Sequence, residues 1–255
     1  MLGWSIPLFR LFGIPLRLHW SFLGLLGWFA WQGWLPDEHG HGGGGRGMFW
    51  TVALLLAFFT CVVLHELGHC LTARRFGIGT RRILLLPIGG MADMEEIPRQ
   101  PSREILMTLA GPAVNFVIAG LLGLATWHIP EMVPLYSPQG LAYELAQWNL
   151  YMGLFNLVPV FPMDGGRIFR ALLATRLPYV RATFVAATVA KVLASGAIIY
   201  AVREHAWQLV ALFAFIFAAG EMEYRFVKRR EAEAEHWHNW WARRDTLTVK
   251  IEPTD

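Results

Sequence analysis

Six runs of apolar residues, separated by shorter polar segments, dominate the pattern of the chain. A helix needs about 20 residues, most of them apolar, to cross the hydrocarbon core of a bilayer. The predicted spans are Trp20–Leu35, Met48–Ala73, Glu104–Ile129, Leu141–Val160, Tyr179–Val202 and Ala206–Phe226. We therefore expect an all-α polytopic membrane protein with about six transmembrane helices. Residues 1–227 would form one domain and residues 228–255 a charged, Trp-rich cytoplasmic tail.

The first run has a second interpretation, as the apolar core of a cleaved signal peptide. Arg10 and Arg17 precede it, as basic residues precede such a core. Cleavage requires small residues near the end of the core, and the run carries Trp28, Trp31 and Trp34 there. A transmembrane helix is the favoured interpretation.

Two short segments outside these runs have the pattern of β-strands. Gly13–His19 precedes the first run, and Ile83–Ile88 lies between the second and third runs, followed by Gly89 and Gly90. The second segment is apolar but too short to span a membrane as a helix. We expect a strand or hairpin there that dips toward the membrane, which gives the fold a small membrane-associated β-segment.

A glycine-rich stretch, Pro36–Gly47, follows the first run and predicts a flexible external loop. It contains His39 and His41, for which a solvated linker is favoured over weak metal binding. The two cysteines, Cys61 and Cys70, fall in or beside one apolar run, so a disulfide scaffold is not expected.

The charge of the chain indicates lipid rather than water as its main surroundings. Only 16% of the residues are charged and 55% are hydrophobic, whereas about 25% are charged in a typical soluble domain. A pI near 9.1 would suggest a nucleic-acid partner for a soluble protein. Here the positions of the basic residues matter more than their sum, and we expect a lipid bilayer and no nucleic acid as partner.

The orientation follows from which loops carry Lys and Arg, because cytoplasmic loops of membrane proteins are enriched in them. With a cytoplasmic N-terminus, 19 of the 22 basic residues fall in cytoplasmic segments. Arg46 and Arg203 fall outside, and Lys191 lies within a span. We expect a multi-pass protein of the cytoplasmic membrane with both termini in the cytoplasm.

The second run contains the sequence His65–His69, which has the pattern H-E-x-x-H. Residues four apart lie on one face of a helix, so both imidazoles can bind a single Zn²⁺, with Glu66 beside it as a general base for water. A soluble helix can carry such a pair without function. At membrane depth, however, ionisable groups are costly and indicate a functional site.

A catalytic zinc ion usually has three protein ligands and a water molecule, so one ligand is missing from this motif. Asp164 follows a segment interrupted by Pro159 and Pro162, at the cytoplasmic end of its span and on the same side as the histidines. Broken backbone at membrane depth occurs where protein or water surrounds it. We predict Asp164 as the third ligand; the alternatives are an Asp-Gly turn at Asp164 and Cys70 as the ligand.

An H-E-x-x-H in one span and the pattern N-x-x-P-x-x-P-x-D-G at Asn156–Gly165 in a later one resemble the site-2 protease family of intramembrane metalloproteases. The resemblance covers residues 1–227 and is closest to the compact six-span bacterial and archaeal type. It implies zinc bound by His65, His69 and Asp164. Family members often carry a PDZ insertion or CBS domains, and we expect neither here.

Two asparagines match further motifs of this family. Asn156 resembles the residue that faces the catalytic cavity, which implies a role in binding the substrate backbone or stabilising the oxyanion. Asn115, within Ala110–Asn115, resembles the last residue of Gly-Pro-x-x-Asn and would face the site; interhelical packing is the alternative. The Leu85–Ala92 segment resembles the family's β-segment, which implies that an unwound substrate pairs with its edge.

The resemblance implies an intramembrane zinc endopeptidase acting on single-span membrane proteins or signal-peptide remnants. The activity would serve regulated intramembrane proteolysis or the clearance of remnants. A metal-ion transporter would also use buried His, Asp and Asn, but it has no need of Glu66 between two histidines to activate water. A proteolytically inactive membrane scaffold is the third hypothesis, against which the intact set of His65, Glu66, His69 and Asp164 argues.

Overall fold

The computed structural model describes residues 4–36, 43–96, 98–128 and 137–248. The chain divides into two compact units, Met1–Val158 and Pro159–Asp255. Both are mostly helical, and the first also contains a small sheet, as the apolar pattern predicts. His39 and His41 lie outside the described residues, as does the end of the predicted tail, residues 249–255.

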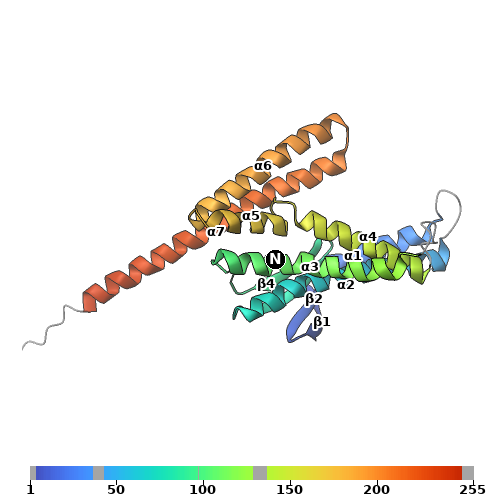
Figure 1. Ribbon diagram of the computed structural model, residues 1–255, viewed down its shortest axis with the longest axis horizontal. Coiled ribbons are helices and arrows are strands. Elements are labelled where there is room, and N and C mark those ends of the chain that lie inside the picture. The colour runs from blue at the N-terminus through green and yellow to red at the C-terminus, as the bar shows by residue number, and fades with distance from the viewer. Residues whose placement is uncertain (1–3, 37–42, 97, 129–136, 249–255) are drawn as a thin grey trace, which may run out of the picture. The chain divides into compact units, whose positions relative to one another are not determined.

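Eleven helices and strands occur in the described part of the chain (Figure 1). The first unit contains β1 (Ser5–Leu11), β2 (Ile14–His19), α1 (Trp20–Trp34), α2 (Gly44–Arg75), β3 (Thr80–Leu86), β4 (Gly89–Met94), α3 (Pro101–Thr126) and α4 (Pro138–Asn156). The second contains α5 (Asp164–Ala174), α6 (Tyr179–Arg203) and α7 (Trp207–Thr248). Each of the six predicted apolar runs coincides with one of the helices α1, α2, α3, α4, α6 and α7.

Three of these helices, α2, α3 and α6, are long and apolar enough to cross a membrane, judged on the described residues alone. Helix α1 has 15 residues, a length of about 22 Å at about 1.5 Å per residue. That is shorter than the hydrocarbon core of a bilayer, which is about 30 Å thick. These three helices support a membrane protein.

The four strands form one sheet in the order β1-β2-β3-β4. Strands β1 and β2 are antiparallel, β2 and β3 are parallel with Leu16 opposite Ile83, and β3 and β4 are antiparallel. The strand predicted at Gly13–His19 is confirmed as β2, and the predicted hairpin is confirmed as β3 and β4. Strand β4 is an edge of the sheet.

An apolar core joins the sheet to α1 and α2 in the first unit. Phe22 of α1 and Phe59 of α2 meet edge to face, with ring centroids 4.6 Å apart. Leu16 and Ile83, paired in the sheet, are buried in the same cluster. The sheet is therefore fixed against the helix that carries the H-E-x-x-H motif.

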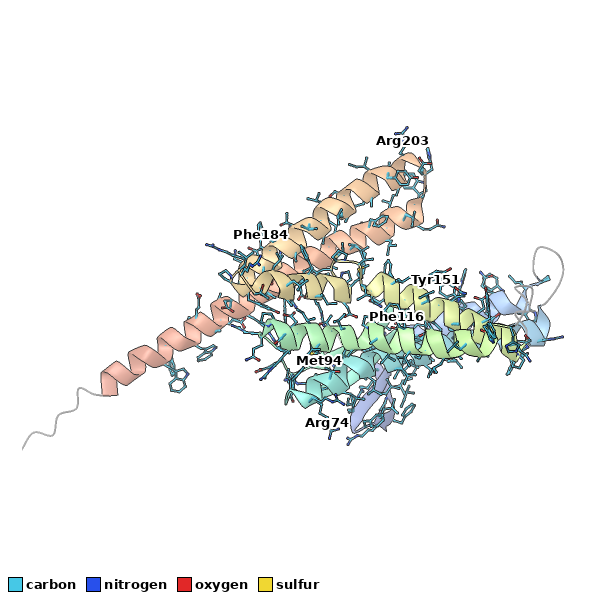
Figure 2. All side chains as sticks on the ribbon, viewed as in Figure 1. Arg74, Met94, Phe116, Tyr151, Phe184 and Arg203 are labelled. Carbon is cyan, nitrogen blue, oxygen red and sulfur yellow. The ribbon has the colours of Figure 1, made fainter. Side chains whose placement is uncertain are left out.

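Helices α3 and α4 pack closely at a glycine. A Cβ atom at Gly153 of α4 would lie 2.9 Å from the ring of Phe116 on α3, which is labelled in Figure 2. Glycine lets the aromatic ring lie directly on the neighbouring backbone, as small residues do in membrane helix pairs.

Two predicted boundaries are wrong. The loop predicted at Pro36–Gly47 is too long, since α2 begins at Gly44, directly after Gly43 with a φ of 76°. The fourth run ends at Asn156 rather than Val160, because the segment after it holds Pro159 and Pro162. Helix α5, Asp164–Ala174, was not predicted.

In the second unit, α6 and α7 lie side by side (Figure 1). Buried alanines line the contact face of α6, where small side chains let two helices approach closely: Ala186, Ala187, Ala190 and Ala194. Helix α7 runs without a break to Thr248, so residues 228–248 of the predicted tail continue the helix. The domain boundary at residue 227 stays a prediction.

Candidate metal centre

The H-E-x-x-H motif lies in the second half of α2, against α3. A Cβ atom at Gly68 would lie 2.7 Å from the carbonyl oxygen of Ala110, so the glycine lets the two helices touch through their backbones. This close approach places His65 and His69, one turn apart on α2, beside the segment of α3 that begins at Ala110. Both histidines are buried.

The two imidazoles converge on one point. Their Nε2 atoms are 3.0 Å apart, and the rings stand edge to face at 84°. The Nδ1 of His69 is 2.8 Å from the carbonyl oxygen of Met107, and the Nδ1 of His65 contacts Oδ1 of Asn115. Since a carbonyl oxygen only accepts, each Nδ1–H donates, and each neutral ring then has an Nε2 lone pair directed at the other.

This arrangement fits a bound cation. Two lone pairs facing each other at 3.0 Å repel unless a positive charge lies next to both. Histidine ligands of zinc typically donate their other ring N–H to a carbonyl or carboxylate, as His65 and His69 do. The donor set and its support are therefore those of two zinc ligands.

Gly111 of α3 keeps space next to both nitrogens. A Cβ atom there would lie 2.2 Å from Nε2 of His69 and 2.7 Å from Nε2 of His65. Any other residue at this position would fill the point at which the two lone pairs meet. Gly111 lies within the motif Ala110–Asn115, but the sequence alone did not indicate that it keeps this space open.

Glu66 extends from α2 toward the edge strand of the sheet. Its Oε2 accepts a hydrogen bond from the backbone N–H of Ala92 on β4, over 3.2 Å. The side chain is half-buried, unlike the fully enclosed imidazoles on either side. Ala92 pairs with Ile83 of β3, and its N–H is directed to α2 rather than to β3. The carboxylate thus lies at the free edge of β4.

Asn115 of α3 lies next to His65, and its role at the site stays a prediction. It is fully buried, and its Oδ1 faces His65 while its Nδ2 donates to Oδ1 of Asn149 on α4, over 2.9 Å. This bond to α4 is the interhelical hydrogen bond that the alternative interpretation requires, so contact with His65 and interhelical packing occur in the same side chain. Asn149 was not predicted; its only signal was an amide in an apolar helix.

The other two predicted residues, Asn156 and Asp164, are described here within their own helices. Asn156 is the last residue of α4, and its Nδ2 donates to the Met152 carbonyl of its own helix, 3.0 Å away. Asp164 belongs to the second unit, where it opens α5. A carboxylate in the first turn is favoured by the positive end of the helix dipole. The roles of both residues stay predictions.

Helix α5 is fixed within the second unit by its first turn and by Arg170. A Cβ atom at Gly166 would lie 2.6 Å from the backbone nitrogen of Phe161, so the first turn folds directly onto the segment before it. Arg170, fully buried, forms an ion pair with Glu223 of α7. Its guanidinium also lies 5.4 Å from the ring centroid of Phe161 and 5.0 Å from that of Tyr179.

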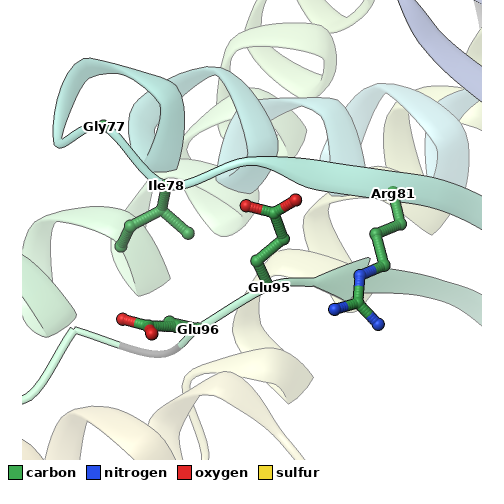
Figure 3. Close-up of a pocket in the computed structure, with 5 residues that line it drawn as sticks. All are labelled: Gly77, Ile78, Arg81, Glu95 and Glu96. Atoms are coloured by element: carbon green, nitrogen blue, oxygen red, sulfur yellow. The ribbon is translucent and has the colours of Figure 1, made fainter.

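A separate pocket of about 280 Å³ lies in the first unit, at the end of the sheet where β3 begins and β4 ends (Figure 3). Its lining consists of Gly77, Ile78, Arg81, Glu95 and Glu96. None of the predicted site residues lines it.

Comparison with known proteins gives a family match and several relatives. Residues 53–132 and 133–199 match the model of Peptidase family M50. The zinc metalloprotease MJ0392 of Methanocaldococcus jannaschii is 36% identical over 227 residues, which is 89% of this chain and 62% of that protein. The putative zinc metalloprotease Rip3 of Mycobacterium tuberculosis is 32% identical over 181 residues, 68% of this chain and 44% of that protein.

The stage IV sporulation protein FB of Bacillus subtilis is 32% identical over 130 residues, half of this chain and 43% of that protein. The chain thus spans less than two thirds of the length of these relatives. Among solved structures, the site-2 protease from Methanocaldococcus jannaschii matches with a TM-score of 0.63 and 34% identity. The match covers 86% of this chain and 95% of that one.

Proposed function

Because the chain belongs to peptidase family M50, we propose that it is an intramembrane zinc endopeptidase that hydrolyses peptide bonds of membrane-spanning substrates. The observation that carries the proposal is the convergence of His65 Nε2 and His69 Nε2, 3.0 Å apart, beside Glu66. A transporter needs the nitrogens, but only hydrolysis needs a carboxylate placed next to them. The family and the geometry of α2 agree on that chemistry.

His65 and His69 would hold the zinc ion, and we propose Asp164 as the third ligand. When bound, zinc would polarise the scissile carbonyl and lower the pKa of a bound water to about 7. Three protein ligands are usual for a catalytic zinc ion. Asp164 suits this role by its place after a proline-interrupted segment and at the start of α5.

Glu66 would act as the general base and then as the general acid. Its carboxylate takes a proton from the attacking water and returns it to the leaving amine. The Ala92 N–H holds the carboxylate at the edge of β4. The carboxylate that transfers the proton and the bound substrate would therefore lie at the same edge, that of β4.

An extended peptide would bind by adding a strand to β4. A helix satisfies its own backbone groups, so a membrane-spanning substrate must unwind locally before its carbonyl is accessible. Strand β4 is an edge of the sheet and offers unpaired backbone groups to such a segment. Asn156 is proposed to bind the substrate backbone or the oxyanion, and Asn115 to act by orienting His65.

The proposed topology has six spans and both termini in the cytoplasm. Helices α1, α4 and α7 would be the other three spans, in addition to α2, α3 and α6. The protease domain would cover residues 1–227, and the tail would cover residues 228–255. The bias of basic residues supports the orientation: 19 of the 22 fall on the cytoplasmic side. Substrates would be single-span membrane proteins or signal-peptide remnants in the cytoplasmic membrane.

The test compares Glu66→Gln with the unchanged protein in detergent or reconstituted bilayers. Cleavage of a single-span substrate is expected to fall by about 10²–10⁴-fold, the usual contribution of a general base, while zinc content stays the same. Glu96→Gln, which changes an exposed acid outside the centre, is the control. Full activity of Glu66→Gln would refute the role of Glu66. Zinc flux without cleavage by the unchanged protein would indicate a transporter.

A further inference from the structure

Asn149 of α4 is the most buried polar residue next to the metal centre that the mechanism does not use. It is fully buried, and both ends of its amide form hydrogen bonds. Its Oδ1 accepts from Nδ2 of Asn115 over 2.9 Å, and its Nδ2 donates to the carbonyl oxygen of Leu145 over 2.7 Å. A chain of hydrogen bonds thus leads from the backbone of α4 to His65.

The backbone carbonyl at the start of this chain fixes the direction of every bond in it. Leu145 O can only accept, so the Asn149 amide must direct its Nδ2 there and its Oδ1 to Asn115. Asn115 must then direct its Nδ2 to Asn149 and its Oδ1 to His65. A flipped amide at either residue would set two donors or two acceptors against each other.

His65 at the far end has no choice of tautomer. Its Nδ1 faces the Oδ1 of Asn115 and must carry a proton, so in the neutral ring Nε2 is the nitrogen with the free lone pair. That nitrogen is the one directed at Nε2 of His69. We propose that Asn149 is a positioning residue of the metal centre, which through Asn115 holds His65 as the metal-binding tautomer. The proposal rests on the proposed zinc site.

His69 provides an internal comparison. Its Nδ1 donates directly to the backbone carbonyl of Met107, a group that cannot flip or rotate away. His65 instead depends on two side-chain amides, each of which can rotate. Removal of Asn149 should therefore disturb His65 and leave His69 in place.

Packing alone does not explain Asn149. Helices α3 and α4 already meet at Gly153, one turn further along α4, where the backbone lies against the Phe116 ring. An apolar side chain at residue 149 would serve that contact equally well. An apolar side chain cannot, however, accept the hydrogen bond that Nδ2 of Asn115 donates.

The experiment measures zinc affinity of the full-length protein in detergent, by competition with a chelator, for Asn149→Leu and Asn149→Ser. The serine hydroxyl can donate to the carbonyl four residues earlier, but it is too short to reach Asn115. Both variants are expected to bind zinc about tenfold or more weakly, the lower end of the effect of outer-shell partners of zinc ligands.

Thr126→Val is the matched control, since the Thr126 hydroxyl is buried in the same unit but donates only to its own helix, to Leu122 O. A double-mutant cycle separates positioning from packing: Asn115→Leu combined with Asn149→Leu should bind zinc no more weakly than Asn115→Leu alone. In the metal-free protein, the ¹⁵N chemical shifts of His65 should report Nδ1–H in the unchanged chain and a tautomer mixture in Asn149→Leu.

Normal zinc affinity in both Asn149→Leu and Asn149→Ser would overturn the proposal, even if they lowered thermal stability. Additive losses in the double-mutant cycle would overturn it as well. If the unchanged protein bound no zinc, the proposed function itself would fail. If it bound zinc and the Asn149 variants matched it, only the positioning role would fail.

Discussion

Gly90 of β4 makes room for the side chain of Glu66: a Cβ atom at residue 90 would lie 2.6 Å from Glu66 Cγ and 3.1 Å from Val62 Cγ1. The carboxylate reaches the Ala92 N–H because residue 90 has no side chain to occupy the space. The general base and the edge strand that would receive substrate are therefore positioned by the same contact.

Gly90→Ala is expected to push Glu66 away from Ala92 and to slow cleavage by about 10²-fold, since a misplacement of about 1 Å can cost that much. Zinc affinity should stay unchanged, because Glu66 is not a ligand. Met91→Ala is the control: adjacent residues of a strand point to opposite faces, and the Met91 side chain is exposed. Equal turnover for Gly90→Ala and Met91→Ala would show that the position of Glu66 is not limiting.

Gly111→Ala is expected to remove zinc binding. The added methyl would lie 2.2 Å from His69 Nε2 and 2.7 Å from His65 Nε2, where the ion would bind both nitrogens. The loss of affinity should exceed the roughly 10–100-fold cost of losing an outer hydrogen-bond partner. Gly120→Ala on the same helix, with open space around its Cβ position, should bind zinc normally. Stoichiometric zinc in purified Gly111→Ala would contradict this geometry.

The sequence predicts one part of this centre because the part is local. His65, Glu66 and His69 lie within five residues of one helix, so the helical repeat alone places both imidazoles on one face. Asn115, which contacts His65, was singled out through its motif, and its role stays a prediction. The Ala92 N–H and the Met107 carbonyl could not be found that way, since backbone groups have no sequence signal and depend on how the sheet and α3 pack against α2.

The fold shows the same limit. Long apolar runs located the helices α1, α2, α3, α4, α6 and α7, because an apolar helix is specified by composition over many residues. Strand β1 was not predicted: its side chains are largely exposed, so no alternation of buried and exposed positions marks it. Helix α5 was not predicted, because its 11 residues are too few to appear as a long apolar run; its Gly166 permits a close backbone contact.

Arg170→Met is expected to destabilise the protein by about 3–5 kcal/mol, the usual cost of breaking a buried ion pair by removing one partner. Arg170 is fully buried, and its removal leaves Glu223 without that cation. Arg225→Met, which removes an exposed arginine from its ion pair with Glu221 on the same helix, should have a much smaller effect. Chemical unfolding in detergent measures both, and equal losses would show that burial does not strengthen the Arg170–Glu223 pair.

Zinc added to metal-free protein is expected to stabilise it, because an ion that binds only the folded state raises the free energy of unfolding by about 2.7 kcal/mol at 100 times Kd. If Asp164 is a ligand, Asp164→Asn should lose most of this stabilisation, as should His65→Ala. Asp93→Asn, which changes a half-exposed acid paired with Arg82, should retain it. Thermal unfolding with and without zinc gives the comparison. Full stabilisation of Asp164→Asn would remove Asp164 from the ligand set, and loss of stabilisation in Cys70→Ala would then identify the buried thiol on α2 as the third ligand.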